Sequence, residues 1–259
     1  MRSETVVEIG CAPVLLRSQD SELQEYIGAK YAHFITDAPS SSPFDLTVDV
    51  DRPASLNIEC REDRWSFGRQ DFRTEWSLKT RRGRVWLAGQ TLDSIDSVLR
   101  ILLSILIVPQ GGSLFHSASA IRDGKAFLFP GVSTAGKSTI SSLAPPDVTV
   151  LTDEISYVRP LGDGYQAFGT PFAGSLNIPG ESISAPLEAV YLLAKGPENK
   201  IDPIARRDAI TAVMRNMLFF TKDPQLTEAL FETACRIVAR VPVYRLAFVP
   251  TPKVWEMIR

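Results

Sequence analysis

The stretch that decides the fold is Gly131-Val-Ser-Thr-Ala-Gly-Lys-Ser-Thr139, a complete G-x-x-x-x-G-K-[ST] motif. In such a loop the glycines let successive backbone N–H groups point inward, where they bind phosphate oxygens. The lysine reaches the β- and γ-phosphates, and the hydroxyl that follows it contacts Mg²⁺. We therefore expect these residues to bind a nucleotide: Gly131, Ser133, Thr134, Ala135, Gly136, Lys137, Ser138 and Thr139.

The residues on either side of the motif support this interpretation. Ala126-Phe-Leu-Phe129 is a short apolar run after the turn Asp123-Gly124, which predicts a buried strand. Lys137 to Leu143 favours a short helix, ended by Pro145-Pro146. Strand, loop and helix follow in the order that the motif requires. The alternative is an ordinary glycine-rich turn before a helix.

Bulk composition excludes several classes of protein. The chain has 259 residues, of which 44% are hydrophobic and 22% charged, as in a soluble globular protein. Its net charge of −2 gives no reason to expect a nucleic-acid partner. Three scattered cysteines, Cys11, Cys60 and Cys235, favour a reducing cytoplasm. The most apolar stretch, Ile101 to Val108, is too short to span a bilayer, so we expect no membrane association.

Strand and helix patterns divide the chain in two. We predict a β-rich antiparallel module over residues 1–90, with one helix from Asp20 to Phe34 and a hairpin at Arg81-Arg82-Gly83. Residues 91–259 favour an α/β domain. It begins with a helix over Leu92 to Val108, for which Thr91 is the expected N-cap. Further strands are predicted at 113–121, 148–158, 165–168, 190–193 and 243–248, and helices from Asp202-Pro203 and Asp223-Pro224.

Two acidic residues follow the motif at the end of an apolar strand. Val148-Thr-Val-Leu-Thr ends in Asp153-Glu154, sixteen positions after Lys137. A carboxylate at such a place suits a metal ligand beside the phosphate loop. Because neighbouring strand residues point to opposite faces, both acids can face one site only if the strand ends or bulges there. The alternative is a pair of solvated acids in a turn.

Several other residues leave alternatives open. His116 is either a hydrogen-bonded core histidine or an imidazole that contacts phosphate and responds to pH. His33 is interpreted as structural. The loop from Gly169 to Asn177 either covers the nucleotide, holds an acceptor, or is only a turn. One arginine of a later helix could stabilise transferred phosphate, although surface arginines usually do not; the candidates are Arg206, Arg207 and Arg215.

Three segments together resemble a known family. His116-Ser-Ala, the run from Asp123 to Thr139, and Leu151-Thr-Asp-Glu are similar to the catalytic domain of HPr(Ser) kinase/phosphorylase. They resemble still more the HPr kinase-related proteins of bacterial gene clusters. The similarity extends through Gly169-Thr-Pro-Phe and Pro186-Leu-Glu-Ala-Val-Tyr, covers about residues 90–259, and is weaker before them.

The resemblance implies a phosphoenolpyruvate carboxykinase-like P-loop core and ATP-dependent phosphorylation of a hydroxyl, often a serine. It implies that Asp153 acts as base, that Ser138, Asp153 and Glu154 hold Mg²⁺, and that His116 senses phosphate. Hexamers in that family suggest a homo-oligomer. The chain departs from the family in having Asp-Glu where HPr kinase has Asp-Asp, and in lacking its C-terminal arginine segment. These departures argue against HPr as acceptor and against the reverse phosphorylase reaction.

The sequence therefore predicts an ATP- and Mg²⁺-dependent kinase of the HPr kinase-like class, with a serine of a protein or peptide as acceptor. Asp153, Lys137 and His116 are the expected catalytic residues. A nucleotide-binding switch with little or no turnover is the alternative. A carboxykinase acting on a small dicarboxylate would need an arginine cluster near the loop, and the sequence shows no clear one.

Overall fold

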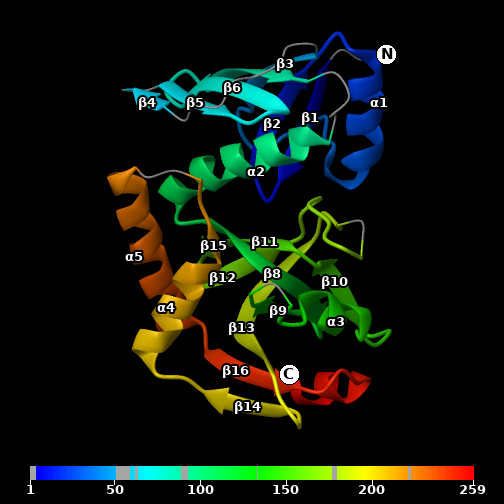
Figure 1. Cartoon of the computed structure of the whole chain (residues 1–259), viewed down its shortest axis with the longest axis vertical. Coiled ribbons are helices and arrows are strands. Elements are labelled where there is room, and N and C mark those ends of the chain that lie inside the picture. The colour runs from blue at the N-terminus through cyan, green and yellow to red at the C-terminus, as the bar shows by residue number, and fades with distance from the viewer. Residues whose placement is uncertain are drawn as a thin grey trace. The chain divides into compact units, whose positions relative to one another are not determined.

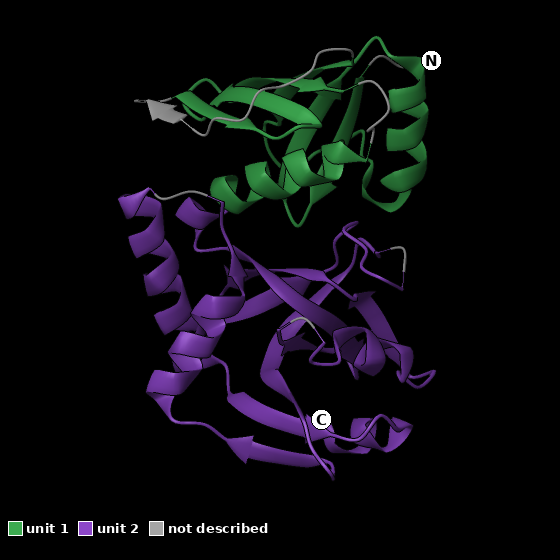
Figure 2. Ribbon diagram, in the orientation of Figure 1, with its two compact units in different colours: residues 1–106 green, residues 107–259 purple. Residues whose placement is uncertain are grey.

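The computed structural model describes residues 4–50, 59–61, 64–88, 93–132, 134–176, 180–220 and 223–259. The chain forms two compact units, residues 1–106 and 107–259 (Figure 2). Each unit is built on one β-sheet, and in each the described residues form more strands than helices. Because both units contain strands and helices, the fold is mixed α/β. Helix α2 (Ser94–Leu106) belongs to the first unit, whereas the sequence placed the division before it, at residue 90.

The sheet of the first unit is mixed, which corrects the prediction of an antiparallel module. Its order is β1-β2-β3-β7-β6-β5-β4, and β3 lies parallel to both β2 and β7. Figure 1 shows this sheet with helices α1 and α2 of the same unit. Helix α1 lies between β2 and β3 along the chain and provides the crossover that a parallel pair needs. The strands are β1 (Glu4–Ile9), β2 (Ala12–Arg17), β3 (Phe44–Val50), β4 (Glu59–Arg61), β5 (Arg64–Gly68), β6 (Phe72–Ser77) and β7 (Arg82–Leu87).

Two helices, rather than the predicted one, complete the first unit. Helix α1 (Ser21–Lys30) begins at Asp20, whose carboxylate accepts the N–H of Leu23 at 2.8 Å, and it is followed by the 3-10 turn η1 (Ala32–Phe34). Helix α2 lies beside β6 and β7 and buries its apolar face, as the sequence pattern predicted. The N-cap expected at Thr91 falls outside the described residues.

The second unit contains the strand order β10-β8-β11-β12-β13-β16-β14, with β9 paired to β8 and β13, and β15 paired to β8. Strand β9 is antiparallel to β8 and parallel to β13. The strands are β8 (Ser113–Arg122), β9 (Lys125–Pro130), β10 (Val148–Thr152), β11 (Ile155–Leu161), β12 (Gly164–Phe168), β13 (Ser184–Lys195), β14 (Lys200–Pro203), β15 (Met217–Leu218) and β16 (Val243–Phe248).

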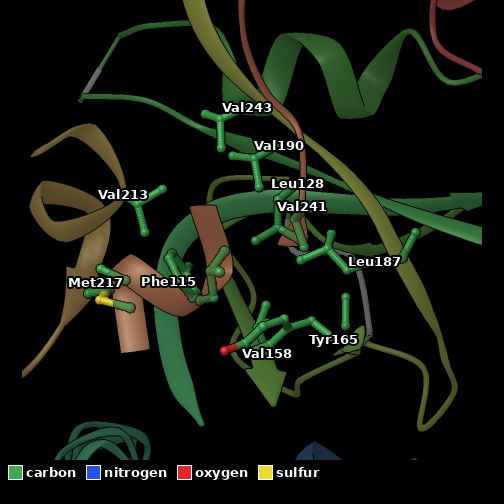
Figure 3. Close-up of a cluster of buried hydrophobic side chains, with 14 of the residues drawn as sticks. Phe115, Leu128, Val158, Tyr165, Leu187, Val190, Val213, Met217, Val241 and Val243 are labelled. Carbon is green, nitrogen blue, oxygen red and sulfur yellow. The ribbon is translucent and has the colours of Figure 1, made fainter. Parts of the chain in front are cut away.

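Strand β9 separates two hydrophobic clusters, which explains why its sequence is apolar throughout. Ala126 and Leu128 pack with α4 (Arg206–Asn216) and α5 (Pro224–Arg240) in the cluster shown in Figure 3. Phe127 and Phe129 face the opposite cluster, which is closed by α3 (Lys137–Ser142) and the 3-10 helix η3 (Pro252–Met257). Alternate side chains of one strand therefore fill two cores, and the phosphate-loop motif follows a strand that is buried on both faces.

One helix start was predicted wrongly and one correctly. Asp202-Pro203 does not open a helix, because Lys200–Pro203 pairs with β16 as an edge strand and α4 begins four residues after Asp202. A proline is tolerated there because the outer side of an edge strand needs no N–H donor. Asp223 does cap α5, with its carboxylate accepting the N–H of Leu226 at 2.9 Å. Among the described residues, no helix combines the length and apolar character needed to cross a bilayer.

Candidate functional site

The motif occupies the turn between β9 and α3, as predicted, and its glycines are required sterically. A Cβ on Gly131 would lie 2.6 Å from the Cβ of Ala135. Gly136 has φ +111, and a Cβ there would lie 2.7 Å from the Cζ of Phe248. Thr134 also has a positive φ of 70. Left-handed residues within a tight loop turn backbone N–H groups toward a common concavity, the arrangement that binds anions. Ser133, expected to bind nucleotide, lies outside the described residues.

Lys137 and Ser138, the first two residues of α3, bond in different directions: Lys137 to the phosphate loop itself and Ser138 to a neighbouring loop. The Lys137 ammonium donates to the carbonyl oxygen of Gly131 at 2.9 Å and so closes the loop on itself. Burial lowers the pKa of Lys137, and the nearby Glu154 carboxylate partly offsets that effect. The Ser138 hydroxyl shares a hydrogen bond of 2.8 Å with the hydroxyl of Ser175. Phosphate bound in this loop would add negative charge beside the half-buried Lys137 ammonium, to that already provided by Glu154.

The acid pair lies in a bend, which satisfies the condition set by the sequence. Strand β10 ends at Thr152 after a break in its register with β8, and β11 begins at Ile155. Asp153 and Glu154 are therefore free of strand alternation, and both line the same pocket as Lys137. The Asp153 side chain is only 2% exposed. Solvated acids in a turn, the alternative interpretation, do not describe Asp153.

A second loop, residues 169–176, holds the Asp153 carboxylate from the other side. Its oxygens accept the backbone N–H of Gly174 at 2.6 Å and that of Leu176 at 3.0 Å. Gly174 must be a glycine, because a Cβ there would lie 2.8 Å from Oδ2 of Asp153. The sequence left three alternatives for this loop: a cover over the nucleotide, a support for an acceptor, or a turn. Its place beside Asp153 and Ser138 assigns it to the site, and the residues that sequence reasoning missed are Gly174, Ser175 and Leu176.

His116 reaches the site through strand register. It lies on β8 directly opposite Ile155, the residue after the acid pair on β11. Its side chain is partly buried and lines the pocket, so it is not enclosed in the hydrophobic core. The other histidine, His33, is exposed on η1 of the first unit. The three arginines considered as phosphate ligands are exposed on α4 and do not line the pocket.

The pocket has a volume of about 350 Å³, within the range of small-molecule sites. It brings together residues from the phosphate loop, the acid pair, β8 and loop 169–176. Its lining is His116, Thr134, Gly136, Lys137, Ser138, Thr139, Asp153, Glu154, Gly174 and Ser175. Gly131 and Ala135 are buried inside the phosphate loop and do not line the pocket, and their close approach sets the tight turn of the loop. The predicted nucleotide, metal and catalytic residues that the structure describes thus converge on one place, and their roles stay predictions.

The oxygen donors of the pocket suit Mg²⁺ as part of a nucleotide complex. Among the described residues, no three His, Cys, Asp or Glu side chains form a ready metal cluster. Mg²⁺ rarely uses such a cluster, because it keeps several waters and binds one or two carboxylates together with substrate phosphates. Ser138, Asp153 and Glu154 offer a hydroxyl and two carboxylates on the same pocket. Each Asp153 oxygen accepts one N–H bond and keeps a second lone pair.

The C-terminal segment supports the phosphate loop from behind. The Trp255 indole N–H donates to the carbonyl oxygen of Ile140 on α3 at 3.1 Å, and its ring is buried. The Arg122 guanidinium bonds the carbonyl oxygen of Trp255. Phe248, the last residue of β16, lies directly against Gly136. These contacts anchor the C-terminal segment to α3 and β8.

Comparison with known proteins gives one family. No curated protein matches the chain. Residues 90–259 match the model of the family described as SynChlorMet cassette protein ScmC. The match covers all of the second unit, including the phosphate loop, the acid pair and loop 169–176. Because it spans well over half of the chain, the chain belongs to the ScmC family of SynChlorMet cassette proteins.

Proposed function

We propose that this protein is an ATP- and Mg²⁺-dependent kinase of the HPr kinase-like class, which transfers the γ-phosphate to a serine hydroxyl of a protein or peptide. One observation supports the proposal above the others. A phosphate loop with its lysine and serine, a buried aspartate with a neighbouring glutamate, and a histidine all line a single pocket. A phosphoryl-transfer site needs these parts, which are charge neutralisation, oxygen ligands for a metal and a positioned base.

Each residue has a role that follows from its place. The loop N–H groups and the Lys137 ammonium would bind and neutralise the β- and γ-phosphates, with Lys137 exchanging Gly131 for phosphate oxygen. Ser138, Asp153 and Glu154 would hold Mg²⁺, which neutralises the charge on the transferred phosphoryl group. Asp153 would accept the proton of the acceptor hydroxyl on the lone pairs that loop 169–176 leaves free. His116 would contact phosphate and make transfer sensitive to pH.

The proposed fold of the second unit is a phosphoenolpyruvate carboxykinase-like P-loop core. The short α3 and the short distance in sequence between Lys137 and Asp153 support it. Asp153-Glu154 and the missing arginine segment distinguish the chain from HPr kinase itself. We therefore propose a protein or peptide acceptor other than HPr.

The acceptor and the activity are tested in one experiment. The full chain is incubated with γ-labelled ATP, Mg²⁺ and an extract of proteins and peptides, and phosphorylated products are identified by mass spectrometry. Label in a defined serine is expected with the wild type and not with Lys137→Ala. If the wild type binds ATP but labels no acceptor and forms no ADP, the kinase proposal is wrong.

The alternative, a nucleotide-binding switch with little turnover, is favoured by one feature. Both Asp153 oxygens and the Ser138 hydroxyl are already bonded to loop 169–176, so nucleotide binding could act by moving this loop. For a switch, the proteolytic sensitivity of residues 169–176 should change when ATP binds, without formation of ADP. A kinase instead produces ADP in proportion to phosphorylated acceptor.

A further inference from the structure

Ser175 occupies an unusual position in the candidate site. Its hydroxyl shares a 2.8 Å hydrogen bond with that of Ser138, the residue expected to hold metal at the phosphates. Its side chain is exposed and lines the same pocket as Lys137. A serine hydroxyl therefore lies inside a site whose proposed reaction is the phosphorylation of a serine hydroxyl.

Asp153, the proposed base, is hydrogen-bonded to the residues on both sides of Ser175. Asp153 accepts the N–H of Gly174, which precedes Ser175, and the N–H of Leu176, which follows it. The carboxylate thus spans the backbone of the residue whose hydroxyl enters the pocket.

From these contacts we infer that the chain phosphorylates itself on Ser175. The inference rests on the proposed kinase function and adds an intramolecular acceptor to it. The Ser175 oxygen attacks the γ-phosphorus of ATP, and a P–O bond forms while the bond between the γ-phosphorus and the β,γ-bridging oxygen breaks. The hydroxyl proton passes to the Asp153 carboxylate, and ADP leaves with the electron pair of the broken bond.

Other hydroxyls of the same segment are poor competitors. Ser156 and Thr170 are 0% and 1% exposed, so neither reaches a nucleotide without unfolding. Ser182 is exposed but does not line the pocket. Ser175 alone among these four combines exposure with a place in the pocket. Because donor site and acceptor lie in one chain, the reaction is expected to be intramolecular, with a rate that does not depend on protein concentration.

The test uses the full chain, γ-labelled ATP and Mg²⁺, without any other acceptor. Cleavage after glutamate releases residues 155–181, because Glu154 and Glu181 bracket the loop. Mass spectrometry of this fragment is expected to show one added phosphoryl group on Ser175. Ser175→Ala should reduce label in the intact chain at least tenfold, whereas the matched change Ser182→Ala, at an exposed serine outside the pocket, should leave it unchanged.

The outcomes separate the inference from the function on which it rests. If the wild type phosphorylates an external acceptor while residues 155–181 stay unmodified, self-phosphorylation is wrong and the kinase proposal stands. If Ser175→Ala keeps the label, or if the labelled fraction rises with protein concentration, the intramolecular assignment to Ser175 is wrong. If the wild type binds ATP yet forms neither ADP nor phosphoprotein, both proposals fail.

Discussion

Replacing Gly174 by alanine should disturb the site without touching any proposed catalytic side chain. The added Cβ would lie 2.8 Å from Oδ2 of Asp153 and 3.0 Å from the Cβ of Glu154. Ordinary contact begins near 3.4 Å, so the loop must retreat from the carboxylate by about 0.6 Å. The N–H of Gly174, now 2.6 Å from Oδ1, would be drawn to about 3.2 Å by such a movement, the long end of the range for an N–H···O bond, and the bond would weaken.

The largest expected effect corresponds to complete loss of this bond. A hydrogen bond to a charged group contributes about 1.5–3 kcal/mol, and an unsatisfied buried carboxylate oxygen costs a similar amount. Expressed in the rate of phosphoryl transfer, this is roughly a 10- to 100-fold decrease, since about 1.4 kcal/mol corresponds to a factor of ten. ATP affinity should change much less, because the three atoms nearest to the added Cβ belong to Asp153 and Glu154 and none to Lys137 or the phosphate loop.

The assay compares ATP binding, measured by titration, with transfer of γ-label to an acceptor, measured on the same preparation. Gly164→Ala is the matched control, because nothing lies within 4 Å of a Cβ at Gly164. Thermal unfolding checks that both variants are folded. If Gly174→Ala transfers phosphate at the wild-type rate, loop 169–176 does not position Asp153, and the reasoning is refuted.

Three further changes have expected outcomes. Gly136→Ala should weaken ATP binding at least tenfold in a titration, since φ +111 is strained for alanine and its Cβ would lie 2.7 Å from Phe248; wild-type affinity would contradict this. Gly28→Ala, in an exposed position of α1 with free space, should raise the free energy of unfolding by about 0.5–1 kcal/mol in urea; no gain would show that the position is strained. The salt bridge from Arg69 lowers the pKa of Asp71 from 3.8 to about 2, so its stabilisation is complete above pH 4 and is lost as pH falls through 2. Asp71→Asn should therefore cost about 1 kcal/mol at neutral pH, after allowance for solvent screening at the half-exposed Arg69, and much less at pH 2. An equal cost at both values would exclude this cause.

The parts of the fold that the sequence predicts are those with local causes. The strand before the phosphate loop was predicted from an apolar run, and β9 is apolar because its two faces fill two cores. Asp20 and Asp223 were predicted as helix starts, and both carboxylates cap their helices. These patterns depend on neighbours in sequence, so a single chain contains enough information to reveal them.

The errors arose from pairings between distant segments. The first unit was predicted as antiparallel, yet β3 lies parallel to β7, a strand that begins more than thirty residues after β3 ends. Hairpin patterns identify neighbouring pairs and are silent about such a partner. Asp202-Pro203 looks like a helix start, but pairing of Ile201 with Leu246 holds the segment in a strand. Tertiary pairing overrode the local preference in both cases.

In the candidate site, too, the residues with a local sequence pattern were predicted, and those that depend on contacts between distant segments were not. Lys137, Ser138, Asp153 and His116 were selected from the sequence, and the structure brings them to one pocket. Ser175 was not selected, because its importance lies only in its contact with Ser138 across the pocket. A serine in a loop has no sequence feature that reveals this contact. Gly174 could have been suspected as a close approach, but the sequence does not say what approaches it.

The most direct test of the central claim is the behaviour of Asp153→Asn. The account predicts that this variant folds and binds Mg²⁺-free ATP like the wild type, because the phosphate loop is unchanged. It also predicts that transfer of γ-label to the acceptor falls by about 10²- to 10⁴-fold, the usual contribution of a general base. Transfer at the wild-type rate by Asp153→Asn would contradict the assignment of this pocket as a kinase site with Asp153 as its base.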